Sequence, residues 1–243
     1  MHTSFVCLTA VSCACAAALA GPAGAIHSTF DTDAQGWSTD KDARNFRWES
    51  TDGNPGGFIA ADDIGSGQYW RFAAPAEYLG DLSAYYGQTL SYELKQLGAV
   101  GTVSNQSDID IVGAGITLEY RFGVTPSGEW TPFSVEISEG AGWEVAGMPA
   151  SEAQIQAVLA DVTSLSIRGE FRVGADSCGL DNVQLGDGCP ADLNNDGELN
   201  FFDVSAFIDA YNTQDPAADF AEPFGEFNFF DVSAFIAAFN AGC

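Results

Sequence analysis

The last quarter of the chain contains an internal repeat, which constrains the fold of that segment more than any other feature of the sequence. Residues 197–212 read GELNFFDVSAFIDAYN and residues 225–240 read GEFNFFDVSAFIAAFN, so 13 of 16 positions are identical at an offset of 28. The repeat predicts two copies of one small unit, each ending in an amphipathic helix. The apolar faces comprise Val204, Phe207, Ile208 and Tyr211 in the first copy, and Val232, Phe235, Ile236 and Phe239 in the second.

The segment before the first helix, residues 192–203, has the pattern of a calcium-binding loop. Oxygen-bearing side chains occupy loop positions 1, 3, 5, 9 and 12, and a glycine at position 6 permits a sharp turn. The predicted metal ligands are Asp192, Asn194, Asp196, Glu198, Asn200 and Asp203, with Glu198 acting through its backbone carbonyl. The alternative is an acidic Asx-turn before a helix that Asp203 caps.

The second copy of the loop lacks several of these oxygen ligands. Counting back from Asp231 places Phe220 and Phe224 at ligand positions 1 and 5. Aligning Asp219 with Asp192 instead needs a one-residue insertion and again leaves ligand positions without suitable side chains. The sequence therefore predicts one strong calcium site and a second that is weak or empty.

The two loop–helix units, bracketed by Gly188-Cys189-Pro190 and Gly242-Cys243, resemble a bacterial dockerin over residues 187–243. The resemblance implies a small α-helical, EF-hand-type domain that docks to a cohesin-like or other cell-surface protein. Cellulosomal dockerins commonly have a Ser-Thr pair at loop positions 10 and 11, where this chain has aromatic pairs. If exposed, these pairs would form an apolar docking surface; the alternative is that they fill the core between the helices. The pairs are Phe201-Phe202 and Phe229-Phe230.

Three cysteines, Cys178, Cys189 and Cys243, follow the first 25 residues. A disulfide between Cys189 and Cys243 would close a 55-residue loop around the repeat and stabilise it by about 4 kcal/mol. An odd number of cysteines leaves one unpaired or bonded to another chain, and the alternative is three reduced thiols.

Residues 1–25 have the features of a signal peptide. The segment contains no Lys, Arg, Asp or Glu, its apolar run is short, and it ends in Ala23-Gly24-Ala25, which suits cleavage after residue 25. We therefore expect a secreted, extracellular protein that a partner could retain at the cell surface. A lipoprotein anchored near Cys13 or Cys15 is the alternative, and no later stretch has the 18 apolar residues of a membrane span.

The balance of charges excludes several classes of function. The chain has 34 acidic and 8 basic residues, a formal net charge of −26, which argues against nucleic acid and anionic membranes as partners. The only histidines, His2 and His27, lie near the N-terminus, so a Ser-His-Asp triad or a His-ligated zinc is nearly excluded.

Residues 26–186 are predicted to form a mainly β domain, an antiparallel jelly-roll-like sandwich with one crossover helix. Ser151 and Gln154 form a capping-box pattern, and apolar spacing predicts a helix over residues 152–162. Strand-like runs recur between turn signals. They are residues 58–61, 69–73, 89–94, 109–112, 115–121, 133–137, 164–168 and 179–185.

Several short sequence segments of this domain are similar to segments of a laminin IV (laminin B) domain. The resemblance extends over nearly the whole of residues 30–186 and implies a jelly-roll-like sandwich akin to carbohydrate-binding modules. The segments include residues 57–63, 69–75, 78–81, 85–92, 115–118, 166–169 and 180–183.

Two features of the sandwich are candidates for ligand binding. Aromatic rings stack on the faces of sugars, although most of them must belong to the core. Acidic residues near both ends of the domain could form a structural calcium site in which Asp31 or Asp33 joins Asp181; the alternative is solvated turn carboxylates. The aromatic set is Trp37, Trp48, Tyr69, Trp70, Tyr85, Tyr86, Trp130 and Trp143.

No catalytic residue is predicted, because the chain contains no nucleophile elbow, phosphate loop or dinucleotide fingerprint. We expect a secreted, non-catalytic binding or adhesion protein whose sandwich recognises a glycan or matrix component. Two alternatives remain open: a component of a polysaccharide-degrading system, and a structural surface-layer or matrix protein.

Overall fold

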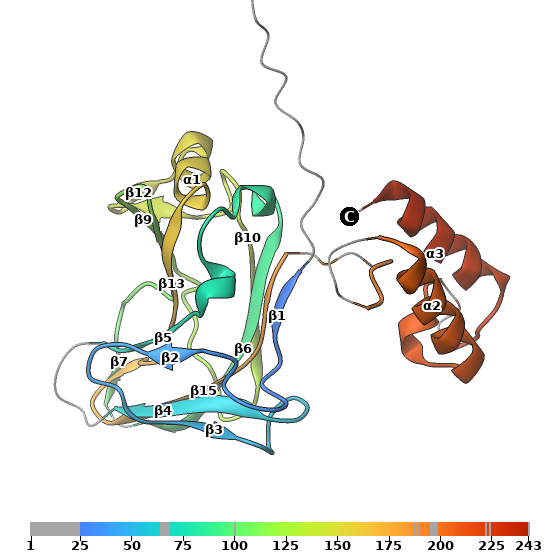
Figure 1. Ribbon diagram of the computed structural model, residues 1–243. Coiled ribbons are helices and arrows are strands. Elements are labelled where there is room, and N and C mark those ends of the chain that lie inside the picture. Colours follow the sequence, from blue (N-terminus) through green and yellow to red (C-terminus); the bar gives the residue numbers. More distant parts are fainter. Residues whose placement is uncertain are drawn as a thin grey trace, which may run out of the picture.

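The computed structural model describes residues 25–63, 69–99, 101–186, 188, 190–194, 199–221, 223 and 225–242. Its larger part is a sandwich of two antiparallel sheets (Figure 1). The first sheet has the order β10-β6-β15-β4-β3, with β1 also paired to β15. Its strands are β1 (Ile26–Ser28), β3 (Arg44–Glu49), β4 (Phe58–Asp63), β6 (Thr89–Ala99), β10 (Thr131–Glu136) and β15 (Asp176–Leu185).

The second sheet has seven strands in the order β12-β11-β9-β8-β13-β5-β2. They are β2 (Ser38–Thr39), β5 (Arg71–Ala73), β8 (Ile109–Gly113), β9 (Ile116–Tyr120), β11 (Glu144–Val145), β12 (Met148–Pro149) and β13 (Val162–Arg168). A separate two-stranded ribbon pairs β7 (Thr102–Val103) with β14 (Arg172–Val173). All eight strand-like runs predicted from the sequence contain a strand of these sheets, so the prediction of an antiparallel sandwich is confirmed.

Alternation of apolar and polar residues determines which face of each strand is buried. In β8, Ile109 and Ile111 are buried and Asp110 is partly exposed; Ile111 pairs with Leu118 and Leu165 on the neighbouring strands. The inward-facing residues of both sheets form one hydrophobic core. Its largest fully buried side chains include Trp70, Trp143, Tyr78, Tyr92, Phe30 and Phe72.

The predicted crossover helix is α1 (Glu152–Leu159), which connects β12 to β13 within the same sheet. Its capping box is the predicted one: the Ser151 hydroxyl accepts a bond from the Gln154 N–H, and Gln154 bonds back to the Ser151 N–H. The predicted C-terminal end at residue 162 was wrong. Val162 begins β13, because its backbone forms hydrogen bonds with Gly80 in both directions.

The repeat folds into two helices of 13 residues each, α2 (Phe201–Thr213) and α3 (Phe229–Ala241), as predicted. They form a hydrophobic cluster of their own, in which the rings of Phe207 and Phe235 stack at a centroid distance of 4.1 Å. Three short 3-10 turns complete the structure: η1 (Ala76–Tyr78), η2 (Ser83–Tyr85) and η3 (Pro216–Ala218). Within the described part of the chain, no helix has the length and apolar character needed to cross a membrane.

Candidate functional site

The outer face of the seven-stranded sheet has a polar groove of about 430 Å³. The strand alternation that sends Ile109 and Ile111 inward sends Asp110 outward, opposite Glu119 on β9 and Ser166 on β13. Arg71 on β5 lies opposite Arg168 on β13 in the strand register, and both side chains are on this same face of the sheet. The groove is lined by Lys41, Tyr69, Arg71, Gln106, Asp110 and Glu119, among others.

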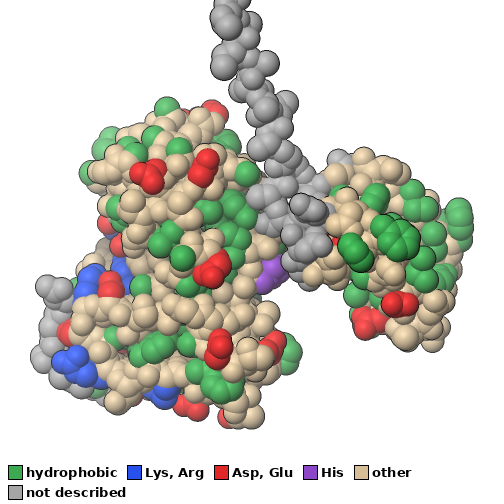
Figure 2. All heavy atoms as spheres, in the orientation of Figure 1, with side chains coloured by type: hydrophobic (Ala, Val, Ile, Leu, Met, Phe, Trp, Pro, Cys, Tyr) green, Lys and Arg blue, Asp and Glu red, His purple; other side chains and the backbone are tan. Residues whose placement is uncertain are grey.

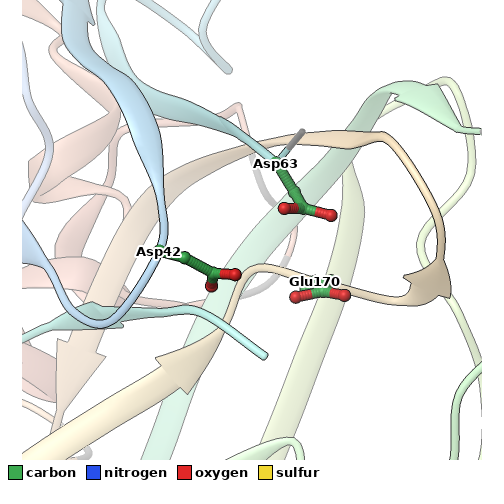
Figure 3. Close-up of side chains that lie close together, drawn as sticks. All are labelled: Asp42, Asp63 and Glu170. Carbon is green, nitrogen blue, oxygen red and sulfur yellow. The ribbon is translucent and has the colours of Figure 1, made fainter. Parts of the chain in front are cut away.

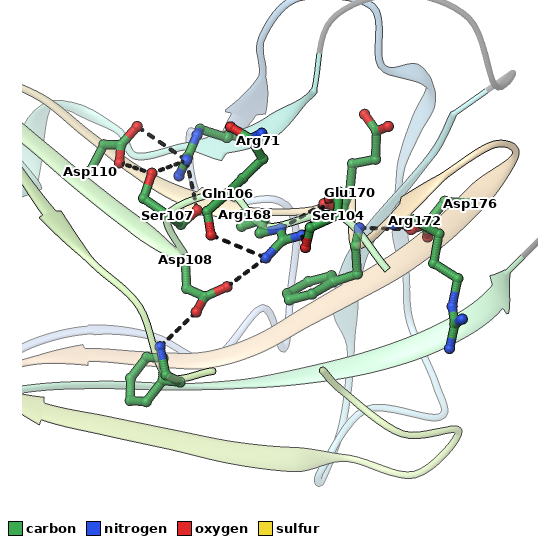
Figure 4. Close-up of polar contacts among 12 residues, drawn as sticks. Arg71, Ser104, Gln106, Ser107, Asp108, Asp110, Arg168, Glu170, Arg172 and Asp176 are labelled. Atoms are coloured by element: carbon green, nitrogen blue, oxygen red, sulfur yellow. Dashed lines mark hydrogen bonds and ion pairs between the residues drawn. The ribbon is translucent and has the colours of Figure 1, made fainter. Parts of the chain in front are cut away.

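Arg71 lines the groove, is largely buried, and is held by several contacts (Figure 4). Its Nη2 is 3.1 Å from Asp110 Oδ2 and donates to the carbonyl and hydroxyl oxygens of Ser107 at 2.7 and 2.6 Å. Nη1 makes no hydrogen bond and is shielded from solvent. Burial raises the pKa of Asp110, although the positive charge of Arg71 opposes that shift. The groove thus presents a fixed, paired guanidinium and carboxylate.

Arg168 anchors the loop that forms one wall of the groove (Figure 4). Its Nη1 is 3.0 Å from Asp108 Oδ1, its Nη2 donates to the carbonyl and hydroxyl oxygens of Ser104, and its guanidinium lies 4.3 Å from the ring centre of Phe171. Only 4% of Arg168 is exposed. Its role is therefore to fix residues 104–108 over the sheet, and with them Gln106 at the groove.

Three carboxylates from distant parts of the chain meet close to this groove (Figure 3). Asp42 lies between β2 and β3, Asp63 ends β4, and Glu170 follows β13; one oxygen of each lies within 4.8 Å of the others. Asp63 and Glu170 are each 6% exposed. Burial, reinforced by the negative charge of Asp63, raises the pKa of Glu170 to about 7. Such a group of oxygens could hold a metal ion.

Sequence reasoning did not find this acidic cluster. Asp62 and Asp63 are neighbours in the sequence, and nothing in the local pattern connects them with Asp42 or Glu170. The register of β4 against β15 turns Asp63 inward and leaves Asp62 partly exposed beside Arg47. Only this pairing of strands reveals which of the two acids is buried.

The other acidic site predicted in the sandwich is partly assembled. Asp181 is fully buried; its Oδ2 accepts a bond from the Asn54 N–H at 2.6 Å and its Oδ1 from the Asn182 N–H at 2.8 Å. Burial raises the pKa of Asp181 to about 6, and the charges of Glu93 and Asp31 contribute. Asp33 is exposed and instead accepts a bond from the backbone of its own turn.

Asp31 lies against the turn that covers Asp181. A Cβ placed on Gly56, whose φ is +84°, would overlap Asp31 Oδ1. The same turn contains Asn54, which donates its N–H to Asp181. Asp31 and Asp181 therefore both contact the turn that contains Asn54 and Gly56, whereas Asp33 bonds within its own turn.

The predicted calcium loop closes onto the first turn of α2. Asp203 is fully buried; its Oδ2 accepts a bond from the Asn200 N–H at 2.8 Å and its Oδ1 from the Asn194 N–H at 3.4 Å. Asn200 in turn caps the helix through the Phe202 N–H at 2.8 Å, and Asp192 is 6% exposed. Asp196 and Glu198, like Cys189 and Cys243, lie outside the described residues.

The loop before α3 makes the same hydrogen bonds to the first turn of its helix, although it lacks several of the oxygen-bearing side chains of the first loop. Asp231 Oδ1 accepts a bond from the Ala221 N–H at 3.0 Å, and its Oδ2 accepts one from the Asn228 N–H at 2.8 Å. Asn228 caps α3 as Asn200 caps α2. The capping residues are therefore the same in both copies, and their side chains accept hydrogen bonds from the first backbone N–H groups of the helices.

The four aromatic residues predicted to bind a partner are exposed. Phe201 and Phe229 are each 75% exposed, Phe202 is 67% and Phe230 is 64%. Hydrophobic side chains gather on this helical pair (Figure 2), and an apolar pocket of about 230 Å³ lies between the two helices. The core between the helices is filled by Phe207 and Phe235, so the alternative that the Phe-Phe pairs fill it was wrong.

Half of the eight aromatic residues considered for sugar stacking are buried in the core, fewer than the majority expected from the sequence. Trp37, Trp70, Trp143 and Tyr85 are buried. The four that retain partial exposure are Trp48, Tyr69, Tyr86 and Trp130. Of these, Tyr69 lines the polar groove.

The chain belongs to the Laminin B (Domain IV) family, whose pattern it matches over residues 69–197. This match confirms the laminin resemblance that the sequence predicted for the sandwich. No curated protein matches the chain.

Among solved structures, the chain is similar to the L4b domain of human laminin alpha-2, with a TM-score of 0.45 and 13% identity over 52% of this chain and 78% of that chain. It is also similar to the family 11 carbohydrate-binding module of the cellulosomal cellulase Lic26A-Cel5E of Clostridium thermocellum. That comparison has a TM-score of 0.45 and 15% identity over 67% of this chain and 94% of the module. These scores reflect a partial likeness of the sandwich and identify no ligand for this chain.

Proposed function

We propose that this chain is a non-catalytic binding protein whose sandwich recognises a carbohydrate in the polar groove of the seven-stranded sheet. The observation that carries the proposal is the ion pair of Arg71 and Asp110 in a groove of about 430 Å³ that Tyr69 and Glu119 also line. Sugar hydroxyls both donate and accept hydrogen bonds, so a wall of fixed donors and acceptors suits them. The ring of Tyr69 offers an apolar surface for a sugar face.

The arrangement of the carboxylates favours binding over hydrolysis. Asp110 and Glu119 are cross-strand partners on adjacent strands, so both approach a ligand from the same side of the groove. A glycosidase needs two carboxylates that flank the scissile bond. We therefore propose that the groove recognises a sugar rather than cleaves it.

The test is binding of the purified full chain to a broad panel of polysaccharides and oligosaccharides. We expect saturable binding to one class, reduced at least tenfold by Asp110→Asn and by Tyr69→Ala. Asp161→Asn, which removes an exposed carboxylate after α1, is the matched control and should bind like the parent chain. Equal binding by all variants would place the sugar site elsewhere. Failure of the chain to bind any sugar of the panel would favour a protein partner or a structural role.

We further propose that residues 187–243 are a dockerin-like, calcium-stabilised module that docks the protein to a cohesin-like or other cell-surface partner. The support is the common fold of the two repeats, the exposure of four phenylalanines, and the apolar pocket between the two helices. The exposed phenylalanines are Phe201, Phe202, Phe229 and Phe230. Calcium would bind in the first loop, through the six ligands predicted there, and a disulfide between Cys189 and Cys243 would close the module.

Calorimetric titration with calcium tests this second proposal. Asp192→Ala should remove the strong site of the helical module, because it deletes a predicted ligand that is largely buried. Asp219→Ala is the matched control from the second copy and should leave that site intact. Two equal strong sites in the loops, or an unchanged site in Asp192→Ala, would contradict the assignment.

Export of the chain is also part of the proposal. Cleavage after residue 25 would leave Ile26, the first residue of β1, as the new N-terminus. Intact-mass measurement of the secreted protein checks this boundary, and the same spectrum before and after reduction shows whether Cys189 and Cys243 are joined.

A further inference from the structure

We propose that Asp42, Asp63 and Glu170 bind a calcium ion in the sandwich, at a site distinct from the loop of residues 192–203. One carboxylate oxygen from each of the three residues lies within 4.8 Å of the other two. The side chains reach this point from three separate segments and turn toward one another (Figure 3). The proposal goes beyond carbohydrate binding and does not depend on it.

The carboxylate of Asp42 provides independent evidence that a ligand belongs in this cluster. Both of its oxygens are shielded from solvent, and neither accepts a hydrogen bond. Among the ion pairs of the described residues, none involves Asp42 or Glu170. A buried carboxylate without a donor or a counter-ion is strongly unfavourable, and a second and third carboxylate beside it increase the cost. A bound cation removes both penalties at once.

The neighbourhood of Glu170 shows the same deficit of positive charge. The Trp70 N–H donates to Glu170 Oε2 at 3.2 Å, and this is a single neutral donor for a residue that is 6% exposed. The nearby guanidinium of Arg168 donates its Nε to the backbone carbonyl of Glu170 and pairs with Asp108, not with the carboxylate. Among the described residues, therefore, the cation nearest to Glu170 is paired with Asp108 and does not neutralise the Glu170 carboxylate.

The chemistry of the cluster favours calcium. Its candidate ligands are all carboxylate oxygens, which suit a hard cation, and two ligands of one calcium ion at about 2.4 Å lie up to about 4.8 Å apart. Magnesium demands a regular octahedron and usually keeps several waters. The sequestered oxygens of Asp42 and the low exposure of Asp63 and Glu170 leave little room for that hydration.

The bound ion would also stabilise the conformation of the polar groove. Asp42 follows Lys41, which lines the groove, and Glu170 is hydrogen-bonded to Trp70, which stands between the groove residues Tyr69 and Arg71. A cation bound by Asp42 and Glu170 would therefore hold in place the two segments that contribute Lys41, Tyr69 and Arg71 to the groove. Because binding of the metal is measured directly and without a sugar, failure of this site and failure of carbohydrate recognition can be distinguished.

The test uses the full chain carrying Asp192→Ala, so that the predicted loop site does not contribute. After removal of metal with a chelator, calorimetric titration with calcium chloride should show one ion per chain, and calcium should raise the melting temperature reported by tryptophan fluorescence. Adding Asp42→Asn or Glu170→Gln should weaken calcium binding at least tenfold. Adding Asp161→Asn, an exposed carboxylate outside the cluster, should change neither result.

The sign of the stability change separates a metal site from a merely structural cluster. Without calcium, Asp42→Asn should leave the melting temperature unchanged or raise it, because one buried charge is removed; with calcium, it should lower the melting temperature relative to its parent. The proposal is overturned if the Asp192→Ala chain binds no calcium, if binding persists in both cluster variants, or if Asp42→Asn has the same effect with and without calcium. Should Glu170→Gln not fold, Asp42→Asn alone decides the question.

Discussion

At the scale of single residues, Gly169 shows how closely the fold packs beside the acidic cluster. A Cβ placed there would overlap the ring of Trp70, which is fully buried and lies 5.0 Å from the ring of Phe72. A bulky, fixed ring cannot move aside as the end of a flexible side chain could. Glycine is required at this position because of the space it leaves, since its φ is not in the left-handed region.

We therefore expect Gly169→Ala to lower the free energy of unfolding by about 1–3 kcal/mol through overpacking. Urea denaturation followed by tryptophan fluorescence measures the effect. Gly128→Ala is the control, because a Cβ at Gly128 would meet open space, and it should change stability by less than about 0.5 kcal/mol. Equal stability of the two variants would show that Trp70 can shift.

Cys178 gives a second prediction at this scale. It is a free thiol, fully buried in β15, and burial raises its pKa well above the usual value. Because the thiolate is the reactive form, Cys178 should not react with a thiol reagent in the native chain at pH 8. On unfolding, one additional thiol should react, and Cys178→Ala should abolish that difference. Reaction of Cys178 in the native chain would contradict its placement in the core.

At the scale of elements, the sequence predicts those features that are local. The starts of α2 and α3 follow from Asn200 with Asp203 and from Asn228 with Asp231, since a capping box involves residues only three apart. The strands likewise follow from alternation. The end of α1 was not predictable, because Val162 continues the helical spacing and only its pairing with Gly80 turns it into a strand.

The candidate sites depend on contacts that a single sequence does not reveal. The groove needs the register of Asp110 against Glu119 and the pairing of Arg71 with Arg168 across β5 and β13. The acidic cluster needs three segments that lie more than 20 residues apart in the chain. By contrast, the calcium-loop pattern before α2 lies within 12 consecutive residues, so the sequence alone was enough to propose it.

The two helix caps allow a matched test of the first loop. Without calcium, Asn200→Ala and Asn228→Ala should each lower the stability of the helical pair by about 1 kcal/mol, because each removes an equivalent cap at 2.8 Å. With calcium, the effect of Asn200→Ala should exceed that of Asn228→Ala, because Asn200 is also a predicted ligand. Melting followed by circular dichroism at 222 nm measures both, and Asn212→Ala, at an exposed position near the end of α2, is the control.

At the scale of the whole molecule, the described residues contain two hydrophobic cores with no residue in common. One core joins the two sheets of the sandwich, and the other joins α2 and α3 around Phe207 and Phe235. Among the described residues, the second core has four buried members: Ala191, Phe207, Ala218 and Phe235. A core of that size supports a fold weakly unless a metal or a disulfide assists it. We therefore expect the helical pair to be the less stable part of the chain.

Spectroscopy can follow the two cores separately. All five tryptophans, Trp37, Trp48, Trp70, Trp130 and Trp143, lie within residues 26–186, so tryptophan fluorescence reports the sandwich. The helical signal at 222 nm comes mainly from α2 and α3, which have 13 residues each, against 8 in α1.

Without calcium, Phe207→Ala should lower the melting temperature recorded at 222 nm and leave the temperature recorded by tryptophan fluorescence unchanged. The ring of Phe207 is 4% exposed and stacks on Phe235, and loss of such a buried phenylalanine costs about 3–5 kcal/mol. Phe202→Ala changes the same residue type on the same helix but at a position that is 67% exposed, so it should shift neither transition. Parallel shifts of both transitions in Phe207→Ala would instead show that the two cores unfold as one cooperative unit, and the helical module could then not be an independently stabilised domain.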